Sequence, residues 1–185
     1  MHPDTMRLID RWVGIPLCFF ASFWPLKKAQ ADSNSTLATN IPPPDTIVFI
    51  LIAEIGALVV AYPAIKETRK QHPKSRICFI TAPAGFQTLV LMGFEKEDIF
   101  LLETSSIKSL LKGIVNIRSH FKGKRVSAIV LEPFTRFSTL LSAWIGASKR
   151  IGCYRFLNEG VYLGNILTHR LVYNPHLHMS QTYFA

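Results

Sequence analysis

The sequence predicts an α/β fold in which helices cover both faces of a doubly wound, mostly parallel sheet. The run from Ile47 to Ala53 is continuously apolar and rich in β-branched residues, as in a strand that is buried on both faces. After a break at 54–56, apolar side chains recur at helical spacing. Further strand-like runs then alternate with helical segments, which is the pattern of a parallel sheet.

The first strand and helix place two polar or flexible residues at one edge of this sheet. The helix from Ala57 is amphipathic, Pro63 is expected to kink it, and His72-Pro73 is expected to end it. Glu54 and Gly56 lie in the turn between the strand and the helix. Because open α/β sheets bind ligands at the carboxyl ends of their strands, this turn is where a site is expected.

The rest of the chain divides into shorter elements. Predicted strands span 76–81, 98–102, 126–131, 150–154 and 171–173. Predicted helices span 86–92, 105–121 and 137–145, and another helix opens at 181–185. A turn is predicted at 83–85, where Pro, Ala and Gly follow one another.

Three segments divide the chain: residues 1–30 form an apolar leader, residues 31–45 a proline-rich linker, and residues 46–185 the α/β domain. The apolar part of the leader spans about 15 residues, short of the ~20 that cross a bilayer. Tryptophans near both of its ends and two lysines behind it favour a helix lying in the headgroup region. Two alternatives stay open, a signal peptide with a cleavage site at 29–31 and packing onto the domain.

The charge of the chain favours anionic partners. The formal net charge is +9 and the isoelectric point is near 9.7. The mean hydropathy of +0.23 is high for a freely soluble domain and indicates a surface that meets a membrane or another partner. The basic residues are scattered and no nucleic-acid-binding module is recognisable, so nucleic acid is not expected to be the partner.

The sequence does not predict disulfides, a metal site or a cofactor site. Cys18, Cys78 and Cys153 lie far apart in apolar contexts, which predicts buried free thiols and no disulfide framework. His176 and His178 have no further ligands at metal-binding spacing, so no metal site is predicted. The turn after the first strand lacks the later glycines of a dinucleotide fingerprint, and no NAD or other cofactor is predicted.

Three segments in order resemble the N-terminal half of the heptosyltransferase-like glycosyltransferases of family 9, the ADP-heptose–lipopolysaccharide heptosyltransferases. The segments are ILIAEIGALVVAYPAIKETRKQHPKSRICFIT, SAIVLEPFTRFSTLLSAWIGASKRIGCYR and THRLVYNPHLHMSQTY. The leader DRWVGIPLCFF is also similar to leaders in part of that family. Each motif alone is moderately specific, and the ordered set is much more so.

The resemblance implies a GT-B fold, with two Rossmann-like domains that face a cleft. It implies that this chain is the N-terminal, acceptor-side domain and that the C-terminal donor domain is absent. That missing domain would bind a nucleotide-sugar donor such as ADP-heptose in the complete enzyme. The implied partners are a lipid-linked anionic glycan acceptor and a membrane surface, at the cytoplasmic face of the bacterial inner membrane. Sugar transfer by this chain alone is therefore not expected.

One departure from the family concerns the catalytic base. An inverting transfer needs a base that takes the proton of the acceptor hydroxyl. The family typically places an aspartate directly after the glycine of the first turn, and this position is Ala57 here. Glu54 is the nearest carboxylate and is the candidate catalytic residue. The alternative is that Glu54 only occupies a helix N-terminus, where the dipole favours an acidic side chain.

Gly56, Arg136 and Arg155 are the candidate acceptor-binding residues. Arg136 follows the fourth strand and is placed to hold an anionic group such as a phosphate. Arg155 and the pair His169-Arg170 are candidates for the same cleft. The alternatives are that these residues are surface charges and that Glu132 only pairs with Arg136.

Two other functions stay open at this stage. A non-catalytic, membrane-bound binding module is favoured by the missing aspartate and the missing domain. A stand-alone nucleotide-binding α/β domain predicts that a nucleotide binds without any acceptor.

Overall fold

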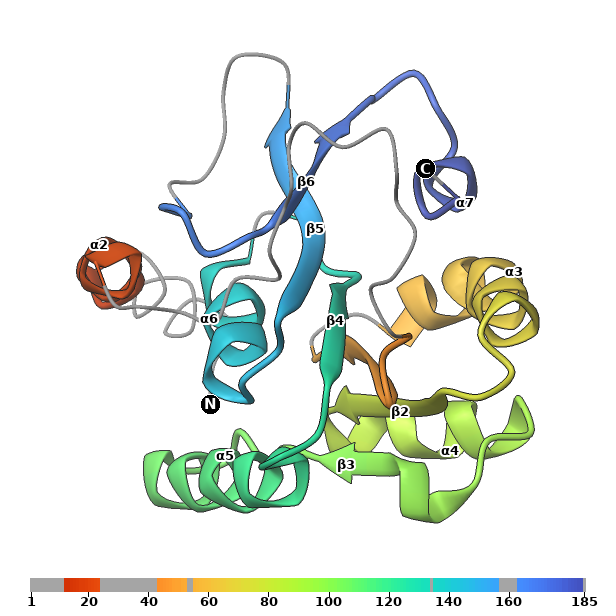
Figure 1. The fold of residues 1–185 in the computed structure, drawn as a ribbon, viewed down its shortest axis with the longest axis horizontal. Helices are drawn as coiled ribbons and strands as arrows, with labels where there is room; N and C mark the ends of the chain where they lie inside the picture. The colour runs from red at the N-terminus through yellow and green to blue at the C-terminus, as the bar shows by residue number, and fades with distance from the viewer. Residues whose placement is uncertain (1–11, 24–42, 53–54, 134, 157–162, 185) are drawn as a thin grey trace.

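The protein forms one parallel sheet with helices on both faces (Figure 1). The computed structural model describes residues 12–23, 43–52, 55–133, 135–156 and 163–184. The strands are β1 (Thr46–Leu51), β2 (Arg76–Thr81), β3 (Ile99–Leu101), β4 (Val126–Val130), β5 (Lys149–Phe156) and β6 (His169–Tyr173). The helices are α2 (Gly14–Phe23), α3 (Ile55–Gln71), α4 (Pro83–Leu91), α5 (Ile107–Phe121), α6 (Arg136–Trp144) and α7 (Met179–Thr182), with a short 3-10 helix, η1, at Lys96–Asp98.

The strand order is β3-β2-β1-β4-β5-β6, and every neighbouring pair is parallel. The chain therefore runs outward from β1 to β3 and then crosses back, so that β4 lies on the other side of β1. This reversal creates a switch point between β1 and β4, where Rossmann-like sheets form their ligand crevice. The predicted doubly wound parallel fold is confirmed.

The sheet is buried on both faces because β1 alternates its side chains between two apolar layers. Val48 and Ile50 pack in one layer with side chains of α5 and α6. Ile47, Phe49 and Leu51 pack in the other layer with side chains of α3 and α4. All six residues of β1 are buried, which confirms the interpretation of its continuous apolar run.

The largest error in the predicted elements is at the start of α4. The predicted turn at 83–85 is wrong, because this helix begins at Pro83, a position where the missing N–H of proline costs nothing. Gly85 lies inside α4 against β2, and a Cβ there would overlap the Oγ1 of Thr81. The glycine therefore permits close packing between helix and strand and does not mark a turn. α3 likewise continues through Pro63 to Gln71.

The apolar N-terminal helix is present as α2, which packs on the outer side of α6 (Figure 1). Gly14 and Cys18, one turn apart, are its buried residues, while Trp12 and Phe20 are among the exposed residues of this segment. No helix within the described residues is long and apolar enough to cross a bilayer. Most of the predicted linker lies outside the described residues, and the proposed domain boundaries stay a prediction.

The three cysteines are expected to resist alkylation in the native protein. Cys18, Cys78 and Cys153 are all buried free thiols, as predicted. Burial raises the pKa of the Cys78 thiol to about 12, with a further contribution from the Asp98 carboxylate, and burial also raises the pKa of Cys153. Because the thiolate is the nucleophile, both groups stay protonated and unreactive. Mass spectrometry after iodoacetamide treatment should show no adducts in buffer and an adduct on every cysteine in urea. Rapid native labelling of Cys78 would contradict the packing of β2.

Candidate functional site

The candidate site is the carboxyl edge of the sheet at the switch point between β1 and β4. β1 ends at Leu51 and β4 at Val130, and the Leu131 N–H donates to the Ile50 carbonyl at 3.0 Å just beyond this point. α3 and α6 both begin at this edge. Their first backbone N–H groups lack partners within the helix and point toward any ligand bound above the strands.

Gly56 lies at this edge, in the first turn of α3 and exposed to solvent. The predicted glycine turn is wrong in detail, since the helix already begins at Ile55. Outside its own helical turn, a Cβ on Gly56 would meet no heavy atom of the described residues within 4 Å. The described residues therefore leave the space outside this helical turn open, as binding of a ligand to its backbone would require.

The residue at the family's aspartate position packs against the core. Ala57 is half-buried, and its methyl group packs against the apolar layer that includes Leu58 and Leu89. The side chain at position 57 thus contributes to packing and carries no proton acceptor. Glu54, the candidate base, lies outside the described residues.

The two candidate arginines follow or belong to strands on the β4 side of β1. Arg136 is the first residue of α6, which follows β4, and its side chain is half-buried. Arg155 lies near the carboxyl end of β5, where it pairs with Val172 after a register shift at Cys153. Its side chain is outside the described part of the chain. Since β1, β4 and β5 are neighbours, Gly56, Arg136 and Arg155 share one edge of the sheet.

The pair His169-Arg170 lies on the strand β6, next to β5. Both residues begin β6, and through β5 His169 is level with Ile129 and Arg170 with Val130, the last residue of β4, so they lie level with the carboxyl half of β4. The Arg170 guanidinium lies 4.3 Å from the centre of the Tyr154 ring and donates to Asn165 Oδ1 at 2.8 Å. That this pair lines the same cleft stays a prediction.

Glu132 is the buried carboxylate at the switch point. Its Oε1 accepts the Ile52 N–H at 2.7 Å, and its Oε2 accepts the Ser138 hydroxyl of α6. Its side chain is 6% exposed. The carboxylate thus connects the end of β1 to the first turns of α6 and fixes the floor of the candidate site. No local pattern indicates these contacts, because Ile52 is 80 residues away.

The C-terminal helix also reaches this edge. The Tyr183 hydroxyl donates to the Leu131 carbonyl at 3.0 Å, and α7 contacts α3. His178 accepts the Ser180 N–H at 3.3 Å through Nδ1 and so caps α7. This cap gives His178 a structural role.

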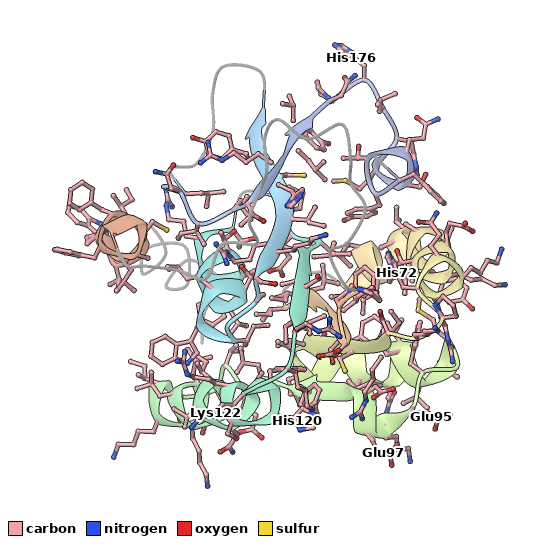
Figure 2. The ribbon with its side chains drawn as sticks, in the orientation of Figure 1. His72, Glu95, Glu97, His120, Lys122 and His176 are labelled. Carbon is pink, nitrogen blue, oxygen red and sulfur yellow. The ribbon has the colours of Figure 1, made fainter. Side chains whose placement is uncertain are left out.

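The described residues contain no group of three or more His, Cys, Asp or Glu side chains that could hold a metal ion. Figure 2 shows that His72, His120 and His176 lie on separate parts of the molecule. Two surface hollows, of about 250 and 350 Å³, also lie elsewhere. The first is lined by the second half of α3 and by Met92 and Phe94, and the second by β3 and α5.

Comparison with solved structures identifies similar folds. The Escherichia coli heptosyltransferase WaaC with ADP-2-deoxy-2-fluoro heptose has a TM-score of 0.58 and 9% identity, over 75% of this chain and 46% of that one. WaaC with ADP gives the same TM-score over 45% of its chain. The family 9 glycosyltransferase of Veillonella parvula DSM 2008 has a TM-score of 0.58 and 19% identity, over 76% of this chain and 39% of its own.

The chain has the fold of these glycosyltransferases. It spans less than half the length of each, which agrees with the predicted resemblance to an N-terminal half. Comparison of the sequence with protein-family models and with curated proteins finds no match. At this level of identity the similarity shows the glycosyltransferase-like fold, and the chemistry has to be argued from the site.

Proposed function

We propose that this chain is the acceptor-side domain of a glycosyltransferase that moves a heptose-like sugar from a nucleotide-sugar to a lipopolysaccharide or related envelope glycan. The observation that carries the proposal is the convergence of Gly56, Arg136 and Arg155 on the carboxyl ends of β1, β4 and β5. This edge belongs to a fold shared with a heptosyltransferase solved with ADP and with an ADP-sugar analogue. The acceptor and the sugar are proposals drawn from this likeness.

In the proposed reaction, the acceptor hydroxyl attacks the anomeric carbon of the sugar. Glu54 takes the proton of that hydroxyl, the new glycosidic bond forms, and the bond to the nucleoside diphosphate breaks with its electron pair on the leaving phosphate oxygen. Glu54 is the candidate because Ala57 cannot accept a proton.

The acceptor would be held mainly through its negative charge. The first turn of α3 presents backbone N–H groups beside an exposed Gly56, and Arg136 begins α6 after the neighbouring strand. Guanidinium and helix N-terminal groups both bind phosphate well. We therefore propose a phosphate-bearing, lipid-linked acceptor, presented at the cytoplasmic face of the inner membrane.

A non-catalytic binding module is the second candidate function. Ala57 favours it, because the position that carries the family's aspartate holds a half-buried methyl group here and offers no proton acceptor. Such a module would hold the acceptor without transferring a sugar.

The role of Glu54 can be tested in a fusion of this chain to the C-terminal half of the Escherichia coli heptosyltransferase WaaC, which was solved with an ADP-heptose analogue. The chain alone is expected to show no turnover with ADP-heptose. In the fusion, Glu54→Gln should lower turnover by about 100-fold or more, which is the usual contribution of a general base. Ala57→Asp is the matched variant, since it restores the family's aspartate and should raise turnover when it is combined with Glu54→Gln.

Four outcomes bear on the role of Glu54 and on the choice between the two functions. Loss of turnover on Glu54→Gln supports the base. Equal turnover of the parent fusion and its Glu54→Gln variant excludes Glu54 as the base. A fusion that gains activity only with Ala57→Asp supports the non-catalytic module, and transfer by the isolated chain would contradict the assignment to an acceptor-side domain.

A further inference from the structure

One flank of the protein combines exposed aliphatic side chains with basic ones. Ile107, Leu111 and Val115 lie four residues apart on α5 and are 64%, 56% and 57% exposed. Residues four apart share one face of a helix, so these side chains form a continuous apolar stripe. Exposed aliphatic side chains in a row are uncommon on a soluble surface and mark a contact site.

The charged side chains that α5 itself carries are all basic. Lys108, Lys112, Arg118 and Lys122 are all exposed, and the segment 107–121 contains no Asp or Glu. A helix with an apolar stripe and flanking lysines or arginines is typical of segments that lie in the interface of a bilayer. An anionic headgroup layer matches this charge.

Trp144 extends the stripe onto α6. Its side chain is 49% exposed, and the Arg118 guanidinium lies 5.0 Å from the centre of its ring. Arg118 also donates through Nη1 to the Trp144 carbonyl. Tryptophan is enriched at headgroup level in membrane proteins, where an adjacent arginine can meet the lipid phosphates.

The leader helix lies on the same side of the sheet. α5 and α6 cover one face together, and α2 packs on the outside of α6 (Figure 1). α2 buries Gly14 and Cys18, while Trp12, Leu17 and Phe20 are exposed. α2 and α5 thus both present exposed apolar side chains on the side of the sheet that α5 and α6 cover.

We propose that this flank, made of the exposed faces of α2 and α5 with Trp144 between them, is a docking surface for an anionic lipid bilayer. α5 supplies the electrostatic contact, and the exposed side chains of both helices enter the headgroup region. A second copy of the chain fits poorly, because a two-fold contact through α5 would bring its lysines against one another. Lipid docking by this flank does not require sugar transfer at the carboxyl edge of the sheet.

Vesicle sedimentation of the full chain tests the charge requirement. The chain should bind vesicles of equal parts phosphatidylglycerol and phosphatidylcholine, and bind pure phosphatidylcholine at least about tenfold more weakly. Lys108→Ala with Lys112→Ala should weaken binding to the mixed vesicles about 30-fold, since each basic residue near an anionic surface contributes about 1 kcal/mol. Lys66→Ala with Arg69→Ala removes the same charge from α3 on the opposite face and should change binding less than about twofold.

A separate variant and the fluorescence of Trp144 test whether the apolar side chains of the flank contact the lipid. Leu111→Ser with Val115→Ser should weaken binding about tenfold or more, and circular dichroism should show an unchanged fold, since both side chains are exposed. With Trp12 and Trp24 replaced by phenylalanine, Trp144 is the remaining tryptophan. Its fluorescence should be quenched by lipids brominated near the headgroup.

Several results would overturn the proposal. One is equal weakening of vesicle binding by the double alanine variants of α3 and of α5. Another is Trp144 fluorescence that stays unquenched in vesicle-bound protein, which would leave the leader as the contact with the lipid. A change in oligomeric state on Leu111→Ser with Val115→Ser, without a change in vesicle binding, would assign the flank to a second copy.

Discussion

Replacing Arg150 by methionine is expected to destabilise the protein by about 3 kcal/mol. The Arg150 side chain is 1% exposed, donates through Nε to the Ile166 carbonyl at 2.6 Å and donates through Nη1 to the Ala147 carbonyl. Burial lowers the pKa of the Arg150 guanidinium, because removal from water disfavours the charged form. The hydrogen bonds to the two carbonyls offset this cost of burying the charge. Methionine fills most of the volume but leaves both carbonyls without these donors.

Urea denaturation, followed by tryptophan fluorescence, measures this loss of folding stability. Arg150→Lys should be nearly as damaging, because an ammonium group cannot reproduce the geometry of the guanidinium fork. Arg69→Met, at an exposed position on α3, is the control and should leave the midpoint unchanged. A midpoint for Arg150→Met equal to that of the parent protein would show that these carbonyl contacts contribute nothing to stability.

Replacing Glu132 by alanine in the otherwise unchanged chain is expected to lower the free energy of unfolding by a similar amount, about 3 kcal/mol. The change leaves the Ile52 N–H and the Ser138 hydroxyl, both bound by this carboxylate, without their acceptor. Glu132→Gln keeps one oxygen acceptor and should cost about 1 kcal/mol. The same urea titration distinguishes the two variants.

Glu103→Ala removes an exposed carboxylate and provides the control for charge. If Glu132→Ala unfolds at the same urea concentration as the control, the buried carboxylate does not hold β1 and α6 together. It would then become a candidate for chemistry in place of Glu54.

The arrangement of the sheet could be predicted because its signals are local. The continuous apolar run of β1 and the alternation of strands with helices depend on residues that are close in sequence. Similarly, Ser106 caps α5 by accepting the Ser109 N–H at 3.1 Å, which fits the predicted start of that helix to within two residues.

The interior of the site could not be predicted, because its contacts join distant residues. Even locally, Pro83 suggests a turn but begins α4, since a proline at a helix start and one in a turn share the same backbone angle. In the sequence Arg150 is one of many scattered basic residues, yet among the residues that the structure describes it is the largest fully buried side chain. The carbonyls that it contacts belong to Ala147 and Ile166, which lie outside the strands. Both carbonyls come within reach of Arg150 only when β5 and β6 pair.

The carboxyl edge of β1, β4 and β5 is expected to bind an anionic glycan acceptor. Calorimetric titration with deacylated lipopolysaccharide from a heptose-deficient strain tests this directly and does not involve the lipid-docking flank. We expect binding that Arg136→Ala weakens about tenfold or more and that Lys66→Ala leaves unchanged, with no heat from ADP-heptose. Binding of ADP-heptose without the glycan, or glycan binding that is insensitive to Arg136→Ala, would contradict the assignment.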